Sequence, residues 1–383
     1  MALRLIVLML APFAFGTGAY VFMGLLEPMA SDLEVSVPVV GQLQSAFAIA
    51  SAFGGPALAV VTNRYERKRL LVVSLLGLAA ANAASAMAGV FPTLVIARLG
   101  AGLVGALTLP VASAIAVSLV GPERRAVALA AVFSGMSFAF LIGIPVGSFV
   151  GAAYGWPASF WLATGLAAFA ALAAAIVIPT IGQLPAPPEG ALQTALRPPA
   201  KRLLAITFLS FLATFTSVAF IGPLVTALTG LVGGDIGLMQ LFVGIGSLFG
   251  LAAGARLAAS RGLAAVPPLL LLVAVSQLMF TIGMVVETAT FGAVVLTAIT
   301  ISLGAGALFA LAPIVQSRLA EIAGPAATVA FALNGSVVFF GQGLGAVIGG
   351  GVIAQVDLTW TGLVGAGIAV VAIAVSQRLA VTR

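Results

Sequence analysis

The sequence contains no cysteine and no histidine, and only 7% of its 383 residues are charged. Without cysteine there can be no disulfide, no thiol chemistry and no thiolate metal site. Without histidine the chain lacks the commonest metal ligand and the side chain that most often carries protons near neutral pH. The residue types that build most active sites are therefore scarce, and we expect neither a metal nor a cofactor.

Apolar residues, in contrast, are abundant. They make up 62% of the chain, and the mean hydropathy is +1.25, whereas soluble domains carry roughly a quarter charged residues. This composition predicts an integral membrane protein surrounded by lipid. The net charge of +6 would suggest a nucleic-acid partner in a soluble chain. Here the cations are spread one to four per loop beside apolar segments, so we expect no nucleic acid.

The apolar segments divide at charges, prolines and glycines into twelve stretches of about 20 residues, the length that crosses a bilayer. Membrane-spanning backbone must satisfy its own hydrogen bonds, which predicts helices. The stretch after Met1 to Arg4 has no small-residue cleavage site before Glu27, and we expect it to be a retained first span. The expected spans cover residues 5–26, 39–61, 70–89, 93–118, 126–151, 158–178, 203–225, 236–258, 265–286, 290–314, 326–353 and 360–376.

The positive charges are one-sided with respect to these spans. Loops after odd-numbered spans carry no cation, and one cation, Arg98, lies inside an apolar stretch. Cytoplasmic loops retain Lys and Arg, so this pattern predicts a cell (inner) membrane protein with both termini in the cytoplasm. The fifteen other cations are Arg4, Arg64, Arg67, Lys68, Arg69, Arg124, Arg125, Arg197, Lys201, Arg202, Arg256, Arg261, Arg318, Arg378 and Arg383.

A proline-rich segment and a weak internal repeat predict two halves. Residues 179–202 contain five prolines after position 180 and read as an extended cytoplasmic linker. Gly121-Pro122 recurs 203 positions later as Gly324-Pro325, and Gly147 recurs as Gly350 at the same interval. One such match can arise by chance, but together with six spans on each side they favour two repeated bundles. The expected division is 1–178, 179–202 and 203–383.

Several short motifs stand out in the first half of the chain. Gly24-Leu25-Leu26 is followed by Ala30, Asp32 and Leu33, and the loop 63–68 reads Asn-Arg-Tyr-Glu-Arg-Lys. Further motifs are Arg98 with Gly102 and Gly105, then 143–147 with Gly151, and 155–160. Together these motifs resemble those of the major facilitator superfamily, and within it the twelve-span drug:proton antiporters that export sugars, nucleosides or drugs. The family's loop is Asp-Arg-x-Gly-Arg-Lys, so Asn63 replaces the acid and Glu66 the glycine, while Glu27 stands where the family usually has proline and Pro28 follows one place later.

The resemblance implies an all-α membrane protein of twelve transmembrane helices in two pseudo-symmetric six-helix bundles. It also implies that the fifth helix lies at the interface between the bundles and that the first and fourth helices line the cavity. Residues expected to control the conformational change are Asn63, Arg64, Arg67, Lys68, Gly143, Pro145, Gly147, Gly151, Gly341 and Gly345. Close helix packing alone is the alternative explanation for the glycines.

Arg98 and Glu27 are the candidates for proton coupling. A guanidinium at membrane depth costs several kcal/mol on insertion scales unless it is paired or hydrated, and Glu27 is the carboxylate that adjoins the first span. An acid that alternates between a hydrated and a paired state can carry a proton. The alternatives are a structural bond from Arg98 to backbone carbonyls of a neighbouring helix and an ordinary interfacial role for Glu27.

Polar side chains on the apolar spans indicate a substrate surface. The seventh span presents hydroxyls at i, i+3, i+7 and i+10, which share one helix face. Such hydroxyls often bond only the preceding turn, and buried amides often tie helices together, so both alternatives stay open. The candidates are Thr17, Tyr20, Thr207, Ser210, Thr214, Ser217, Asn334 and Gln342.

These features predict a monomeric secondary transporter that exports a small neutral or amphiphilic molecule, of drug, sugar or nucleoside type, in exchange for protons. No phosphate-binding loop ending in Lys-Ser or Lys-Thr is present, so an ATP-driven mechanism is not expected. The main alternative is an uncoupled facilitator or importer, which the replacement of the loop acid by Asn63 favours. A membrane-embedded enzyme is a remote alternative, because it needs paired acids or a serine with a base at depth.

Overall fold

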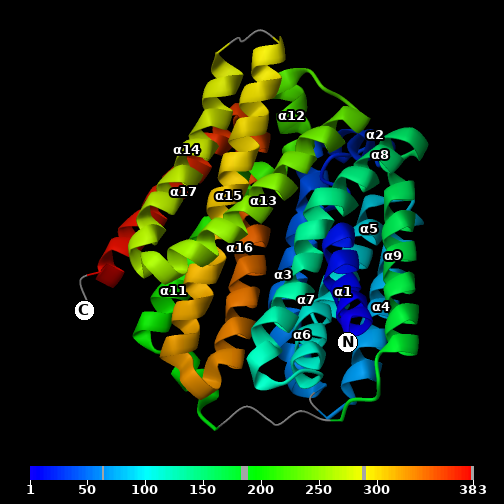
Figure 1. Ribbon diagram of the computed structural model, residues 1–383. Coiled ribbons are helices and arrows are strands. Elements are labelled where there is room, and N and C mark those ends of the chain that lie inside the picture. Colours follow the sequence, from blue (N-terminus) through cyan, green and yellow to red (C-terminus); the bar gives the residue numbers. More distant parts are fainter. Residues whose placement is uncertain (63, 183–188, 287–289, 381–383) are drawn as a thin grey trace.

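The computed structural model covers residues 1–383 and describes all of them except 63, 183–188, 287–289 and 381–383 (Figure 1). The described residues form helices joined by turns, without a β-strand. The helices are α1 (Ala2–Tyr20), α2 (Leu26–Asp32), α3 (Val37–Val61), α4 (Arg67–Ala86), α5 (Phe91–Gly105), α6 (Thr108–Ser118), α7 (Arg125–Phe138), η2 (Ala139–Gly143), α8 (Ile144–Tyr154), α9 (Trp156–Val177), α10 (Ala191–Ala195), α11 (Pro198–Val218), α12 (Ile221–Thr229), α13 (Gly234–Ser260), α14 (Val266–Val285), α15 (Thr290–Ala323), α16 (Ala327–Gln355) and α17 (Thr361–Ala380).

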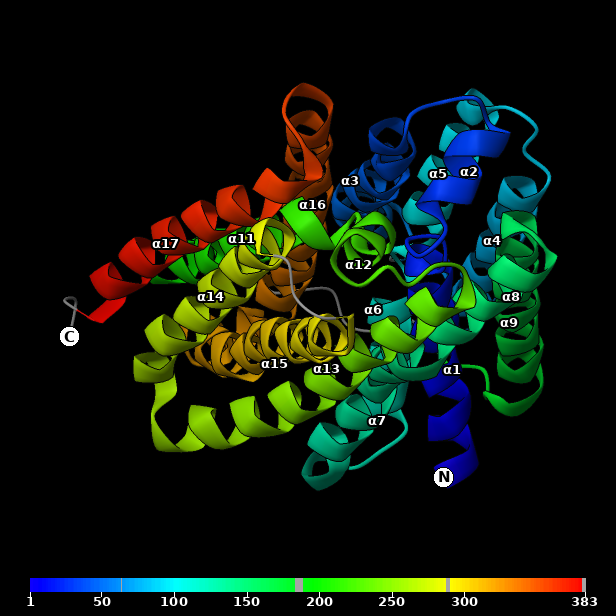
Figure 2. The same ribbon diagram turned by 90° about the horizontal axis from the view of Figure 1, so that it is seen from above.

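The expected number of membrane crossings is consistent with these helices. Eleven helical segments of the described chain are long and apolar enough to span a bilayer, and one of them, Phe291–Gln355, has 65 residues and contains both α15 and α16. Helices α1–α9 form the first bundle and α11–α17 the second, which lie side by side in Figures 1 and 2. The two bundles share a pattern, since each begins with a long helix followed by a short one, α1 with α2 and α11 with α12.

Two spans are irregular where proline removes a backbone donor. The fourth span divides into α5 and α6 at Ala106 and Leu107, because Pro110 cannot donate to the carbonyl four residues earlier. The fifth span contains one turn of π-helix, η2, just before Pro145. A proline ring clashes with the carbonyl at i−4, here Leu141, which lies in η2. Such π-helical turns are frequent at functional sites.

Glycine rows bring helices close together inside each bundle. Gly143, Gly147 and Gly151 on the fifth span face Thr17, Val21 and Leu25 of the first, and a Cβ on any of the three would clash there. In the second bundle, a Cβ on Gly341 or Gly345 would lie 2.6 Å from the Phe208 carbonyl oxygen or 2.7 Å from that of Leu212, both on α11. Close approach of backbones adds van der Waals contact where lipid offers no hydrophobic driving force.

These glycines therefore pack within the bundles, and their role in the conformational change stays a prediction. The fifth and eleventh helices themselves do lie at the boundary between the bundles. Other faces of the same helices meet across the boundary. A Cβ on Gly343 would lie 2.8 Å from a side-chain carbon of Ile49 on α3, and a Cβ on Gly237 of α13 would lie 3.0 Å from the Pro145 carbonyl oxygen. We call this boundary between the first and second bundles the seam.

The linker is less extended than the sequence suggested. Ala191–Ala195 forms α10, because this stretch contains no proline, and α11 begins at Pro198 rather than at 203. Ala191 and Ala195 are buried with Leu319, Ala323 and other apolar residues of α15 and α16. Thus the part of the linker that follows position 189 packs against the second bundle.

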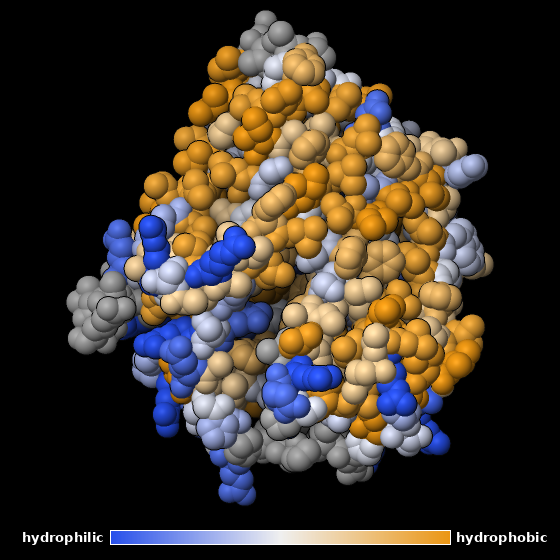
Figure 3. Space-filling view, viewed as in Figure 1, coloured by the Kyte–Doolittle hydropathy of each residue, from blue (hydrophilic) through white to orange (hydrophobic). Residues whose placement is uncertain are grey.

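One end of the molecule, which we call the basic end, carries turns and helix ends with positive charges. Arg64 and Arg124 lie between α-helices there, and Arg69, Lys201 and Arg318 lie near the ends of α4, α11 and α15. In Figure 3 the hydrophilic side chains gather in the lower part of the view, and hydrophobic side chains cover most of the rest of this face. The same view shows a recess between the two bundles that opens toward these hydrophilic residues. The large apolar face is suited to contact with lipid.

Candidate functional site at the seam between the bundles

Arg98 lies on α5 and is completely buried inside the first bundle. Its Nη1 donates to the Gly18 carbonyl oxygen at 2.9 Å, and its Nη2 donates to the Ala19 carbonyl oxygen at 3.0 Å. The guanidinium also lies over three phenyl rings, at 4.5 Å from the centroid of Phe47, 5.0 Å from Phe22 and 5.5 Å from Phe160. Cation–π contacts of this kind partly replace lost hydration. The geometry is that of a structural bond to a neighbouring helix.

The hydrogen bonds from Arg98 supply donors to backbone carbonyls at the end of α1. Helix α1 ends at Tyr20, and the chain turns over 21–24 before α2 begins at Leu26. The last carbonyls of a helix lack backbone donors, and a cation near that end also interacts favourably with the helix dipole. Arg98 therefore caps α1 from across the bundle. Within the described residues it has no carboxylate partner.

Glu27 lies in the first turn of α2 and is exposed. It is not in contact with Arg98, so the structure does not bring the two predicted proton-coupling residues together. Their roles in coupling stay a prediction. Nearby, the Trp156 Nε1 donates to Asp32 Oδ2 at 3.0 Å, which joins two of the motifs noted in the sequence.

Tyr20, one of the predicted substrate residues, lines a cavity. Its hydroxyl donates to Gln342 Oε1 of α16 at 3.0 Å, so this hydrogen bond crosses the seam. The Tyr20 ring stacks on Phe140 with centroids 5.2 Å apart, and Phe215 of α11 lies 6.2 Å away. These three rings, Gln240 and several aliphatic side chains line a cavity of about 30 Å³. None of the residues that line it is charged.

The other predicted substrate residues are occupied elsewhere. Ser210 and Thr214 donate to carbonyls one turn earlier on α11, at 2.6 and 2.9 Å, and Thr17 does the same on α1 at 2.9 Å. Thr207 donates to Asn334 Oδ1 at 2.9 Å and ties α11 to α16 within the second bundle. The hydroxyl of Ser217 is buried without a hydrogen bond. The structure thus groups Tyr20 with Gln342 and separates both from the hydroxyl row.

Gln240 is a cavity residue that the sequence reasoning missed. The Ser148 Oγ of α8 donates to Gln240 Oε1 of α13 at 2.6 Å, which is a second side-chain bond across the seam. Gln42 Nε2 of α3 adds a third bond, to the Ala346 carbonyl oxygen at 3.2 Å. A glutamine inside an apolar span is the signal that finds these residues, because a buried amide needs partners. By the same signal Gln44 and Asn82 stand out, since both are fully buried with no hydrogen bond to their amides.

The loop between α3 and α4 is held by Glu66, the residue that replaces the glycine of the resembled motif. Its carboxylate accepts bonds from the amides of Lys68, Arg69 and Ile181, each at 2.9 Å, and so caps α4 and holds the chain that leaves α9. Burial raises the pKa of Glu66, but the bonds from Ile181, Arg69 and Lys68 outweigh it and the pKa lies below its ordinary value. The cap is therefore ionised at neutral pH. Arg64 stacks on Tyr65, and Asn63 lies outside the described residues.

The sequence model of the Major Facilitator Superfamily matches residues 8–330 of this chain. The chain belongs to the major facilitator superfamily. A chloramphenicol resistance protein of Streptomyces lividans is 37% identical over 283 residues, which cover 71% of each chain. The inner membrane transport protein YdhP of Escherichia coli strain K12 is 29% identical over 351 residues, which cover 91% of this chain and 88% of its own.

Solved structures of transporters have the same fold. A mutant of the nucleoside transporter NupG superposes with a TM-score of 0.76 at 16% identity, covering 98% of this chain and 99% of its own. The D-xylose-proton symporter gives a TM-score of 0.74 at 17% identity, covering 98% and 97%. These likenesses establish the fold that the sequence motifs had indicated.

Proposed function

We propose that this chain is a secondary transporter that exports a small neutral or amphiphilic organic molecule in exchange for protons. The observation that carries the proposal is the cavity at the seam, which has aromatic walls, an amide and no charged lining residue. A multiply charged substrate or a metal ion would need inward-facing charges or carboxylates. The name of the relative, a chloramphenicol resistance protein, supports efflux. Chloramphenicol is also a neutral aromatic amphiphile, the kind of molecule that such a cavity suits.

The contacts across the seam support alternating access. The three side-chain bonds, and a fourth from the Gly222 amide to the Met23 carbonyl oxygen at 3.2 Å, lie toward the end opposite the basic end. We propose that this arrangement is the state open to the cytoplasm, with the recess in Figure 3 as its entrance. Opening to the other side then requires these bonds to break while the bundles rock.

Uptake by proteoliposomes tests the proposal as a whole. Purified protein should transport one or more members of a panel of sugars, nucleosides and hydrophobic drugs, and an imposed pH gradient should accelerate that transport. Transport that ignores the pH gradient would favour the uncoupled facilitator. Protein that moves nothing in the panel faster than empty liposomes would contradict both.

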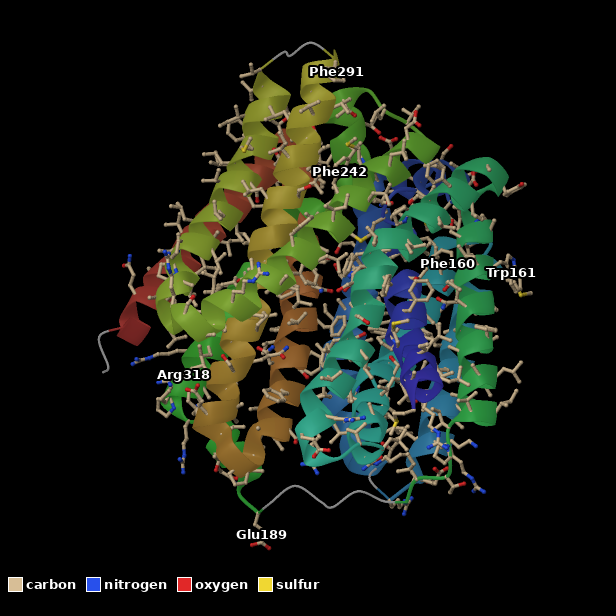
Figure 4. All side chains as sticks on the ribbon, in the orientation of Figure 1. Phe160, Trp161, Glu189, Phe242, Phe291 and Arg318 are labelled. Carbon is tan, nitrogen blue, oxygen red and sulfur yellow. The ribbon has the colours of Figure 1, made fainter. Side chains whose placement is uncertain are left out.

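We propose that the chain divides into a first bundle at 1–178, a linker at 179–202 and a second bundle at 203–383. We also place the basic end and both termini in the cytoplasm. Glu189 projects from the basic end, and Phe291 lies at the opposite end (Figure 4). The natural chain has no cysteine, so single cysteines report cleanly. In intact cells an impermeant thiol reagent should label Phe291→Cys and leave Glu189→Cys unlabelled until the membrane is opened. The reverse pattern would invert the topology.

Glu27 is proposed as the proton carrier. Replacing it should therefore remove the coupling of transport to the pH gradient without removing substrate binding. Glu27→Gln keeps the shape of the side chain and removes its titration. The variant should lose acceleration by a pH gradient but retain substrate exchange in proteoliposomes. The exposed neighbour Glu34 offers a matched control, and Glu34→Gln should stay coupled. If Glu27→Gln still concentrates substrate when protons flow, another carrier or a facilitator mechanism is the better explanation.

A further inference from the structure

We propose that the substrate replaces the hydrogen bond between Tyr20 and Gln342 with one of its own. The preferred substrate is then a planar aromatic molecule that bears a neutral hydroxyl or amide group. This inference rests on the proposed function, because Tyr20 lines the same cavity; Gln342 does not line it but holds the Tyr20 hydroxyl from the second bundle. It adds which side chains recognise the aromatic part and which recognise the polar part.

The size of the cavity is the first step. Its volume of about 30 Å³ holds one or two water molecules, whereas a drug-sized ligand occupies a pocket of roughly 300–1,000 Å³. A substrate can therefore enter only if the walls part. Tyr20 belongs to the first bundle, and Phe215 and Gln240 belong to the second, so the walls part most directly at the seam.

The aromatic walls define one part of the substrate. Tyr20 and Phe140 are parallel to within 27° at a centroid distance of 5.2 Å, and the Phe140 ring meets Phe309 edge-on at 5.5 Å. When the bundles part, Tyr20 and Phe140 stay together on the first bundle, while Tyr20 gives up its contact with Phe215 and Phe140 gives up its contact with Phe309. A planar ring that enters at the seam can take over these two contacts, because aromatic pairs accept offset and edge-to-face geometries. An aliphatic substrate of the same size would recover the buried area but not this geometry.

The polar part of the substrate follows from the side-chain groups that lose their hydrogen bond when the cavity walls part. Moving Tyr20 away from Phe215 also withdraws its hydroxyl from Gln342 Oε1, and Tyr20 and Gln342 are each only 3% exposed. Buried polar groups without partners are costly, so a substrate that supplies a donor to Gln342 binds better than one that does not. Gln342 accepts through Oε1 at this contact, so a substrate that donates replaces the Tyr20 hydroxyl directly. A hydroxyl or amide N–H does so without bringing charge into a cavity whose lining has none.

Binding of two matched probes to the purified protein tests the inference. The probes are 2-naphthol, which has a ring and a donor, and 2-methoxynaphthalene, which has the same ring without the donor. Isothermal titration should give about tenfold tighter binding of 2-naphthol to the natural protein, the effect of one buried hydrogen bond. Gln342→Met should remove this preference and leave the affinity for 2-methoxynaphthalene unchanged.

Two further variants distinguish recognition from damage to the fold. Phe140→Leu should weaken both probes by a similar factor, because it removes the stacking partner and leaves Gln342 in place. Ser210→Ala, on α11 away from the cavity lining, should change neither. A preference for 2-naphthol that survives in Gln342→Met would overturn the inference. Transport of a neutral solute with no measurable binding of either naphthalene would overturn it too, yet leave the proposed transporter function standing.

Discussion

Replacing Arg98 with alanine is expected to abolish transport while the protein still inserts into the membrane. The substitution leaves the Gly18 and Ala19 carbonyls without donors at the buried end of α1, and each orphaned group costs about 1–3 kcal/mol. It also removes the cation that lies among Phe22, Phe47 and Phe160. Tyr20, the last residue of α1, then loses the fixed position from which it reaches Gln342.

Three companion variants show which property of Arg98 matters. Arg98→Lys should recover little activity, because an ammonium cannot donate to two adjacent carbonyls as a planar guanidinium does. Arg98→Met fills the volume without any donor and should fail as alanine does. Arg318→Ala, which breaks an exposed ion pair with Glu321, is the control and should be active. Near-normal transport by Arg98→Ala at equal expression would show that capping of α1 is dispensable.

Adding one methyl group at Gly244 is expected to reduce transport more than tenfold. Gly244 of α13 faces η2 across the seam, and a Cβ there would lie 2.7 Å from the backbone nitrogen of Leu141 and closer still to its Cα. Backbone cannot rotate away as a side chain can, so Gly244→Ala must push the two bundles apart where α13 meets η2. The close contact across the seam is lost, and with it the closed state that the transport cycle requires.

The matched control for this variant is Gly351→Ala on α16, where an added Cβ meets nothing within 4 Å. Alanine also has higher helix propensity than glycine, so this variant should be at least as stable as the natural protein. Transport rates at equal expression provide the comparison. Equal activity of Gly244→Ala and Gly351→Ala would show that the bundles do not need close contact between α13 and η2.

Hydrophobicity and the positions of charges, prolines and glycines were sufficient to predict membrane-spanning helices, because span length and backbone hydrogen bonding leave few choices in a bilayer. The arrangement in two six-helix bundles came from the weak internal repeat and the family resemblance. The motifs around 63–68 and 143–147 identified the family correctly. The motifs did not predict which face of each helix contacts which neighbouring helix. Gly147 illustrates this, since its spacing predicted close packing but its partner, Val21 of α1, depends on how the helices rotate.

The site was predicted in part. Arg98, Tyr20 and Gln342 were all selected from the sequence, yet the bond between the last two joins residues 322 positions apart, and no local pattern contains it. The hydroxyls on α11 follow the alternative that the sequence left open, since Ser210 and Thr214 donate to carbonyls of their own helix. Their role in binding substrate stays a prediction. Gln240 was missed although it is an amide in a long apolar stretch, because its role depends on Ser148 in the other bundle, which no local pattern contains.

Uptake into inside-out membrane vesicles tests the central claim, proton-driven export of a neutral aromatic solute, most directly. Vesicles containing the natural protein, with an acidic interior generated by respiration, should accumulate a labelled neutral aromatic amphiphile. The accumulation should collapse when a protonophore is added and should be absent with Arg98→Ala. Uptake that equals that of vesicles lacking the protein, or that is unaffected by the protonophore, would contradict the claim.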